Sequence, residues 1–223
     1  MQAQLLLTIA IPTCNRVTYL RKTLTQLQLE IVSYHLGNIE ILVSDNASSD
    51  STQQVVAELQ DSGLNICYFL NSDNIGSDAN IAQCFNVAKG HYVLILGDDD
   101  LLCDGSLKWL MTALEQNEYG VICMRPYGFD HDFRREYPGI SGRDQTFNDA
   151  GEFLVAIGSL VTLISGCVIN KRCLPGVDAN VFCGSNLVQV HLVIQAAMTI
   201  KNNLYSSRYH VACKRNNSGD YDY

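Results

Sequence analysis

Residues 91–104 read HYVLILGDDDLLCD, and this stretch predicts the fold. Its apolar part, residues 92–96, is rich in residues that favour β-strands and has no polar interruption. Such a run is typical of a strand that is buried on both faces in a parallel sheet. The run ends at Gly97 and is followed directly by Asp98, Asp99 and Asp100. We therefore expect three carboxylates at the carboxyl end of a buried strand.

Three adjacent carboxylates repel one another and are costly to remove from water, so a cation or a set of donors is expected beside them. Clustered oxygen ligands suit hard ions such as Mg²⁺ or Mn²⁺, which commonly bridge to the phosphates of a substrate. The alternative is a structural acidic turn in which Asp104 caps the helix that follows. The triplet alone leaves both interpretations open.

The composition is that of a globular protein with a sizeable core. The chain has 223 residues, of which 47% are hydrophobic, enough for one domain or for one domain with a small lobe. Its longest apolar stretch, residues 159–169, is interrupted by polar residues and is too short to cross a bilayer. The N-terminus lacks a basic region and a cleavage site, so we expect a first strand there and no signal peptide.

The charge and the cysteines exclude several classes of protein. The formal net charge is −8, which repels nucleic acid and anionic lipid, so no nucleic-acid partner is expected. A phosphate site in so acidic a chain needs a metal, an arginine or backbone amides beside it. The nine cysteines form no CxxC pair; thiols inside apolar runs favour a reducing cytoplasm, and structural zinc is not expected.

The first half of the sequence alternates between strand and helix patterns. Strands are predicted at residues 5–11, 39–43, 66–70 and 92–96, and the segments between them carry apolar residues at helical spacing. This alternation predicts a parallel sheet with helices on both faces. Polar clusters follow every one of these strands, at the edge where such sheets bind ligands.

Two familiar phosphate-binding patterns are missing. No GxGxxG follows the first strand and no GxxxxGK[ST] occurs in the chain, so neither a dinucleotide-binding Rossmann site nor a P-loop is expected. The polar edge could hold a nucleotide base and ribose by hydrogen bonds, and a diphosphate through a metal ion.

Three segments, IAIPTCNRVTYL, EILVSDNASSDST and NIGSDANIAQCFNVAKGHYVLILGDDDLL, together resemble the N-terminal half of the inverting family 2 glycosyltransferases. The resemblance implies a GT-A fold, which is an α/β fold with a Rossmann-like, mostly parallel sheet flanked by helices on both faces and a smaller acceptor-side region. Residues 1–125 would bind the nucleotide sugar, and residues 126–223 would form the acceptor-side half of the same domain. The second half is most similar to enzymes of bacterial surface polysaccharide or O-antigen assembly.

The resemblance also implies roles for individual residues. Nucleotide-binding roles follow for Pro12, Thr13, Asn15, Arg16, Asp45, Asn74, Gly76, Asn80, Asp98 and Arg215. Asp99 would be the metal ligand with Asp100 in support, although Gly97 stands where many relatives have the first Asp of an Asp-x-Asp-Asp turn. The structural alternatives are a helix cap at Asn15 and Arg16 and an Asx-turn at Asp45.

Beyond the fourth strand the sequence predicts a helix at residues 105–116, a fifth strand at 121–124 and a long irregular loop at 126–147. Loops of that length usually carry function or are mobile. Near the end, Arg215, Asn216 and Ser218 resemble a segment that can approach the diphosphate in this subgroup, and a flexible polar tail is the alternative.

An inverting transfer needs a base for the acceptor hydroxyl. Most relatives supply an Asp from a Glu-Asp pair, but Ser185 and Asn186 stand in the corresponding place. His191 is the nearest titratable side chain and Asp178 is the other candidate, although His191 could simply belong to the polar face of a helix.

The expected function is metal-dependent transfer of a sugar, with inversion, from a nucleotide-diphosphate sugar to a glycan or lipid-linked acceptor. UDP is the first choice of nucleotide, and CDP, GDP and dTDP stay open. A cytoplasmic location is expected, with peripheral attachment at the inner membrane as a further option. A catalytically impaired nucleotide-sugar-binding protein of the same fold is the alternative, while a nucleotidyltransferase would need a glycine-rich basic loop after the first strand.

Overall fold

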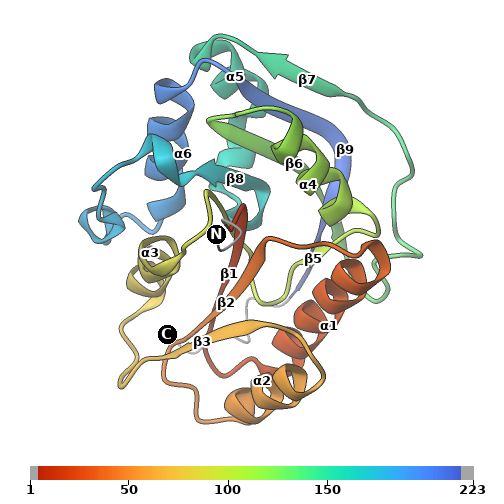
Figure 1. Ribbon diagram of the computed structural model, residues 1–223, viewed down its shortest axis with the longest axis vertical. Coiled ribbons are helices and arrows are strands. Elements are labelled where there is room, and N and C mark those ends of the chain that lie inside the picture. Colours follow the sequence, from red (N-terminus) through yellow and green to blue (C-terminus); the bar gives the residue numbers. More distant parts are fainter. Residues whose placement is uncertain (1–4, 217–223) are drawn as a thin grey trace.

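The computed structural model describes residues 5–216 of the chain. Its first half alternates strands and helices as predicted (Figure 1). The elements are β1 (Leu7–Thr13), α1 (Val17–Tyr34), β2 (Ile39–Asp45), α2 (Thr52–Asp61), β3 (Ile66–Leu70), α3 (Ser77–Val87) and β4 (Tyr92–Ile95). β2 and β4 pair in parallel with β1, and β3 pairs in parallel with β2. The predicted parallel sheet is confirmed.

The second half extends the same sheet. Its elements are β5 (Leu101–Leu102), α4 (Ser106–Gln116), β6 (Val121–Phe129), β7 (Asp144–Phe147), α5 (Ala150–Ile157), β8 (Cys167–Asn170), α6 (Val188–Thr199) and β9 (Asn203–Lys214), with short 3₁₀ turns at Gly158–Thr162, Ile164–Gly166, Lys171–Cys173 and Ala179–Phe182. The strand order is β3-β2-β1-β4-β8-β6-β9-β5, with β7 paired to β9. β6 runs through the predicted boundary at residue 125, so both halves share one sheet.

Helices cover the sheet on both sides: α1, α2 and α4 lie on one face, and α3, α5 and α6 lie on the other (Figure 1). The alternation of side chains along each strand explains the two cores. In β4, Tyr92 and Leu94 belong to the cluster under α1, whereas Val93 and Ile95 belong to the cluster under α3. The run is unbroken because both faces of the strand are buried, as the sequence predicted.

β1 continues past Pro12, where the sequence predicted its end. The backbone polar groups of Ala10 face β4, because its carbonyl accepts a hydrogen bond from the backbone N–H of Leu96. Pro12, two residues later, faces the same side. The β1–β4 pairing ends at Ala10 and Ile95, so the N–H that proline lacks has no strand to bond on that side. The strand thus delivers Thr13 to the edge of the sheet.

The prediction of an irregular loop at residues 126–147 is wrong at both ends. β6 extends to Phe129 through its pairing with β9, and β7 at Asp144–Phe147 adds to the outer side of β9. These strands depend on long-range pairing, which local sequence patterns do not report. The true connection between them is residues 130–143.

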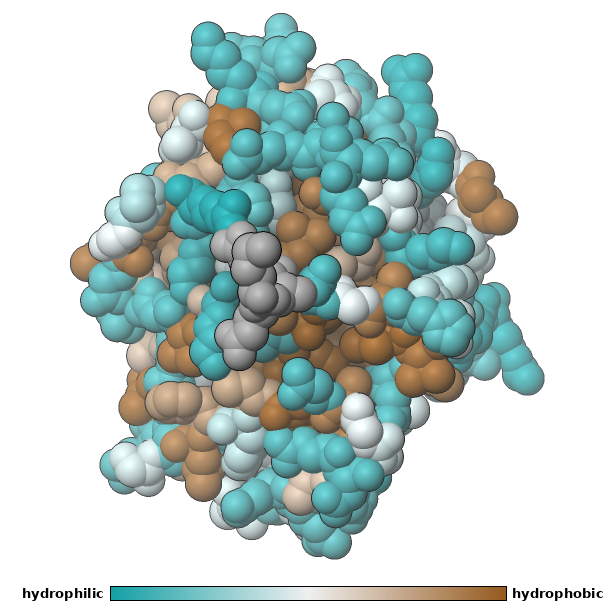
Figure 2. Space-filling view, in the orientation of Figure 1, coloured by the Kyte–Doolittle hydropathy of each residue, from teal (hydrophilic) through white to brown (hydrophobic). Residues whose placement is uncertain are grey.

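Asp104 does not cap α4. Glu30, on α1, accepts hydrogen bonds from the backbone N–H groups of Gly105 (2.8 Å) and Leu107 (3.2 Å), and Asp104 pairs with Arg134 instead. Within the described part of the chain, no helix is both long and apolar enough to cross a membrane. Hydrophilic residues cover most of the face shown in Figure 2, and hydrophobic residues gather toward its middle.

Candidate functional site

The polar loops meet where β1 and β4 end. The sheet order reverses there, because the chain passes outward from β1 to β2 and β3 and then returns to the other side of β1. Loops after such neighbouring strands diverge and leave a crevice that usually holds the ligand. Thr13, at the end of β1, donates a hydrogen bond of 2.7 Å from its hydroxyl to Asp98, which follows β4. The predicted convergence of these two segments is present.

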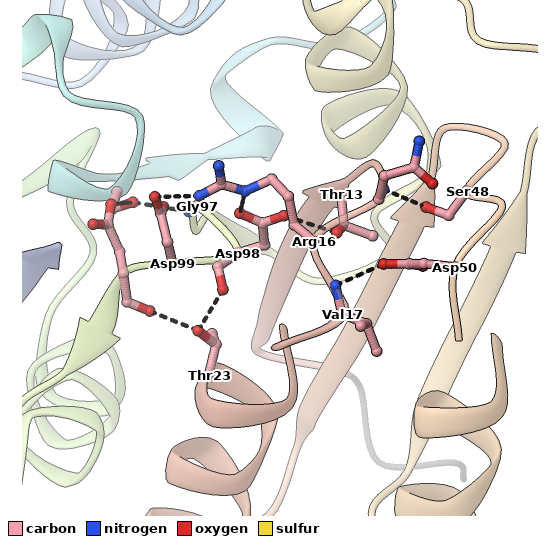
Figure 3. Close-up of polar contacts among 12 residues, drawn as sticks. Thr13, Arg16, Val17, Thr23, Ser48, Asp50, Gly97, Asp98 and Asp99 are labelled. Atoms are coloured by element: carbon pink, nitrogen blue, oxygen red, sulfur yellow. Dashed lines mark hydrogen bonds and ion pairs between the residues drawn. The ribbon is translucent and has the colours of Figure 1, made fainter. Parts of the chain in front are cut away.

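Arg16 joins the same cluster and neutralises part of the acidic triplet (Figure 3). Its Nε lies 2.9 Å from Asp98 Oδ1, and its Nη2 lies 2.5 Å from Asp99 Oδ2. Its side chain is only 3% exposed, and its guanidinium lies 4.6 Å from the centre of the Tyr19 ring. The arginine that the sequence placed in a nucleotide-binding loop is thus also the main cation of the triplet.

Asp100 is held by Ser165, which lies just before β8. The Ser165 hydroxyl donates to the Asp100 carboxylate and accepts a hydrogen bond of 2.9 Å from the backbone N–H of Gly97. A Cβ at position 97 would lie 3.1 Å from an Asp100 oxygen and 3.2 Å from an Asp99 oxygen. Glycine therefore fits a turn that packs carboxylates this tightly, which gives a reason for the departure from Asp-x-Asp-Asp.

Burial raises the pKa of all three carboxyl groups. Burial raises the pKa of Asp98 to about 6, although Arg16 and the Thr13 hydroxyl act in the opposite direction. Burial, assisted by the charge of Asp99, raises the pKa of Asp100 to about 7. The pKa of Asp99 is raised for the same first reason and is held down by Arg16. All three carboxyl groups are therefore fully ionised near neutral pH only when a cation lies close to them.

A cleft of about 670 Å³ opens over this cluster, large enough for a nucleotide. Nine predicted site residues line it: Pro12, Thr13, Arg16, Asn74, Gly76, Asn80, Asp98, Asp99 and Asp100. Residues that the sequence did not indicate complete the lining, namely Cys14, Asn46, Ser77, Ile81, Gly97, Thr162, Leu163, Ile164, Cys213 and Lys214. Asn46 was available from the sequence as part of the polar cluster after the second strand, whereas residues 162–164 carried no signal.

Hydrogen bonds between asparagine side chains stabilise the side of this cleft next to α3. The Asn74 side-chain oxygen accepts hydrogen bonds from the Asn46 side chain (2.6 Å) and from the backbone N–H of Gly76 (2.9 Å). Asn80 accepts from the Ser44 hydroxyl at 2.7 Å and donates to the Ser44 carbonyl. Gly76 has φ +84°, a conformation that glycine adopts without strain. These bonds fix the segment before α3 against the end of β2.

Three predicted nucleotide-binding residues do not line this cleft. The Asn15 side chain accepts from the backbone N–H of Ser49. Asp45 is buried and accepts from the backbone N–H of Ser48 and the Tyr68 hydroxyl. Asn15 and Asp45 thereby order the loop between β2 and α2. The Asp45 contact with Ser48 agrees with its structural alternative, a local turn, whereas Arg16, which precedes α1, provides no side-chain cap, so the alternative of a helix cap at Asn15 and Arg16 is wrong. Arg215 pairs with Asp130 at 3.1 Å, and its neighbour Lys214 lines the cleft; Ser218 lies outside the described residues.

The structure does not bring His191 or Asp178 to the acidic triplet. The exposed His191 ring stacks on Phe182 at 4.8 Å. Asp178 does not line the cleft; it accepts a hydrogen bond from Asn86 near the end of α3, about 7.5 Å along the helix beyond the cleft residue Ile81. Hydrogen bonds from the Asn180 backbone and Asn86 lower the pKa of Asp178, which weakens it as a base. The geometry therefore gives no support to either residue as the catalytic base.

A second cleft, of about 710 Å³, lies between α1 and the 129–134 segment. It shares Asp99 and Lys214 with the first cleft. Phe129 and Phe133 contribute aromatic surface, and Lys22 contributes a cation. The two clefts thus adjoin at one carboxylate and one ammonium group.

The described residues offer no all-protein metal cage, because no group of three or more His, Cys, Asp or Glu side chains among them could hold an ion. Mg²⁺ and Mn²⁺, however, are often held by one or two carboxylates together with substrate phosphates and water. Asp99 and Asp100 line the cleft and supply such oxygens. The residues therefore fit an ion that is bound together with a diphosphate.

Comparison with known families identifies the chain. A model described as glycosyl transferase family 2 matches residues 8–172, well over half of its length. The chain belongs to glycosyl transferase family 2. The family resemblance expected from the three sequence segments is thereby confirmed.

Two curated relatives each match about half of this family 2 chain. It is 35% identical over 122 residues to the abequosyltransferase RfbV of Salmonella typhimurium, with 54% of this chain and 36% of the relative covered. It is 38% identical over 111 residues to the GalNAc(5)-diNAcBac-PP-undecaprenol beta-1,3-glucosyltransferase of Campylobacter jejuni, with 49% and 35% covered. The family 2 chain thus spans about a third of the length of these relatives.

Solved structures resemble nearly the whole chain. TarS residues 1–349 of S. aureus in complex with UDP has a TM-score of 0.73 at 15% identity, covering 95% of this chain and 61% of that one. The mannosyltransferase PcManGT of Pyrobaculum calidifontis with GDP-Man and Mn²⁺ has a TM-score of 0.59 at 14% identity, covering 96% and 55%. At these identities the likeness shows the fold alone, and that fold is the predicted GT-A type.

Proposed function

We propose that this family 2 chain transfers a sugar, with inversion, from a nucleotide-diphosphate sugar to a glycan or lipid-linked acceptor, with a divalent metal ion. The carrying observation is the convergence of Thr13, Arg16 and the acidic triplet on one cleft at the switch point of the sheet. UDP is the first choice of nucleotide, with CDP, GDP and dTDP as alternatives. The Campylobacter relative's name contains an undecaprenol-linked saccharide, which supports a lipid-linked acceptor here.

The donor is assigned to the first cleft. Asn74, Asn80 and Gly76 would lie along the nucleotide, and Thr13 and Asp98 would hydrogen-bond its polar groups. Arg16 and Lys214 are the cations that line this cleft and suit a diphosphate. A divalent ion on Asp99, supported by Asp100, would neutralise charge that develops on the departing diphosphate. We retain Asn15, Asp45 and Arg215 only as residues that position these loops.

The acceptor is assigned to the second cleft. Inversion in a single displacement requires the acceptor oxygen to attack the sugar's anomeric carbon opposite the diphosphate. In the same displacement the bond to the diphosphate breaks, the leaving group keeps the electron pair, and the acceptor's hydroxyl proton passes to a base or to water. The acceptor must therefore reach the donor sugar from a separate side, and the two clefts adjoin at Asp99 and Lys214. Phe129 and Phe133 provide apolar faces for a saccharide ring, and Lys22 with Gln26 provides polar groups around them.

The division of the chain and its location remain parts of this proposal. In this proposal residues 1–125 supply most of the donor cleft, and residues 126–223 add Phe129 and Phe133 to an acceptor cleft that also draws on α1. A lipid-linked acceptor on the inner face of a membrane would require a cytoplasmic protein that attaches at the inner membrane.

A binding protein without turnover is the second candidate. It is favoured by one observation: Ser185 and Asn186 stand where relatives carry the Glu-Asp pair, and His191 and Asp178 lie outside both clefts. Such a protein would keep the donor cleft intact and lack a group that removes the acceptor proton.

One set of measurements separates these candidates. Isothermal titration with UDP, CDP, GDP and dTDP in the presence of Mn²⁺ reports nucleotide binding, and thermal shifts with the same ligands report it independently. Release of the nucleoside diphosphate from UDP-sugars, in the presence of a panel of p-nitrophenyl glycosides, reports transfer, and NMR of the product reports the anomeric configuration. Binding with transfer supports the enzyme, and binding without transfer supports the second candidate. If no nucleotide binds, the proposed function is refuted.

A further inference from the structure

The acidic triplet already contains a cation within bonding distance. Arg16 contacts Asp98 at 2.9 Å and Asp99 at 2.5 Å, and its side chain is 3% exposed. The guanidinium keeps its charge at every pH at which proteins fold. Asp98 and Asp99 therefore have an internal counter-charge that occupies oxygens facing the donor cleft.

This arrangement opposes metal binding by Asp99 alone. An ion on the Asp99 carboxylate would lie close to the guanidinium, and like charges repel strongly where water is excluded. Salt screens such a buried pair poorly. An ion would also compete for Asp99 Oδ2, the oxygen that Arg16 contacts. The metal and the arginine therefore compete for the same carboxylate.

We propose that Arg16 controls metal binding: its guanidinium holds Asp99 until a nucleotide binds, then pairs with the diphosphate and leaves Asp99 to the divalent ion. This inference rests on the proposed function. Arg16 and Asp99 line the same cleft, so a diphosphate bound there lies within reach of the guanidinium. Guanidinium groups bind phosphate through two parallel hydrogen bonds, which replaces the pairing lost with Asp99. Nucleotide and ion therefore bind cooperatively.

Lys214 offers the competing explanation. It also lines the donor cleft, and its charge acts on Asp99, so it could hold the diphosphate without any movement of Arg16. In that case removal of the Arg16 charge would improve Mn²⁺ binding by the same factor with and without nucleotide. The factor by which UDP improves Mn²⁺ affinity is therefore the informative measurement.

The test uses Mn²⁺ as the probe and electron paramagnetic resonance to count free ions, with and without UDP. We expect Arg16→Gln to bind Mn²⁺ alone at least about tenfold more tightly than the natural protein, which is within the usual range of coupling between sites. We also expect UDP to improve Mn²⁺ binding by a smaller factor in Arg16→Gln than in the natural protein. Arg135→Gln is the control, because Arg135 is exposed, pairs with Asp132 at the surface and lines neither cleft.

Circular dichroism establishes whether Arg16→Gln folds, since it leaves two buried carboxylates without their partner. If it does not fold, Arg16→Lys takes its place: it keeps the charge, loses the two-point contact and should bind Mn²⁺ alone more tightly than the natural protein. The proposal is overturned by equal Mn²⁺ affinity of the folded variant and the natural protein. It is also overturned if UDP improves Mn²⁺ binding by the same factor in both, which is the result expected if Lys214 alone holds the diphosphate. If UDP does not bind at all, the proposed function fails, but the comparison of Mn²⁺ affinities without nucleotide still tests the role of Arg16.

Discussion

Substitution of Asp100 by asparagine should make the protein more stable at alkaline pH. Burial and the charge of Asp99 raise the pKa of Asp100 from the usual 3.8 to about 7. Between these values the folded protein keeps a proton that the unfolded chain has released. The stability from this group is therefore complete below about pH 4 and is lost as the pH rises to about 7.

The expected size follows from these two values. The difference between 3.8 and about 7 corresponds to on the order of 4 kcal/mol, of which about 3 kcal/mol is lost between pH 5 and pH 8. Asparagine does not ionise, and its oxygen can still accept the Ser165 hydroxyl. Asp98, whose pKa is raised to about 6, keeps its own contribution, so the pH dependence should shrink but not disappear.

Urea unfolding, followed by circular dichroism at pH 5 and pH 8 with a chelator present, measures this effect. Asp100→Asn should lose clearly less free energy of unfolding between the two pH values than the natural protein. Asp61→Asn, at an exposed position at the end of α2, is the control and should follow the natural protein. If Asp100→Asn and the natural protein lose equal free energy over this range, burial does not raise the pKa of Asp100 and the reasoning is refuted.

Three further substitutions test the two clefts. Lys214→Ala should raise the dissociation constant of UDP about tenfold by calorimetry, because a charged hydrogen bond contributes about 1.5–3 kcal/mol; Lys201→Ala, at an exposed site, should not. Phe133→Ala should raise KM for the acceptor and leave UDP affinity unchanged, and an equal loss of both would contradict a separate acceptor cleft. His191→Gln should keep the kcat of the natural protein in the transfer assay, since the His191 ring packs on Phe182 away from the triplet. Loss of turnover with intact UDP binding would instead support His191 as the catalytic base.

The alternation of elements in the first half could be predicted because it depends on local periodicity. An unbroken apolar run such as residues 92–96 reports burial on both faces, and the polar residues after each strand must then share one edge of a parallel sheet. That reasoning was sufficient to bring Thr13 and Asp98 together. It could not reveal which cation neutralises the triplet, because Arg16 and Asp99 are neighbours only through the pairing of β1 with β4.

The second half could be predicted less well because its strands depend on distant partners. The register of β9 determines that Lys214 faces the cleft while Arg215 pairs with Asp130. Successive side chains of a strand point to opposite faces, so an uncertainty of one residue in the register exchanges the two. The sequence indicated Arg215 for the site, and the structure places its neighbour Lys214 in the wall of the cleft.

The charge of the chain and the geometry of its cleft are connected. A protein with a net charge of −8 repels a diphosphate at long range, so attraction must arise locally. Arg16 and Lys214 supply it from opposite ends of the sequence, and both line the donor cleft. Arg16, however, is already paired with Asp98 and Asp99. We therefore expect its guanidinium to bind a ligand only when another cation replaces it beside these carboxylates. Under our proposal, the acidic triplet, the arginine and a divalent ion would act as one charge-balanced unit, in which an incoming diphosphate and its metal ion exchange partners with side chains that already compensate one another.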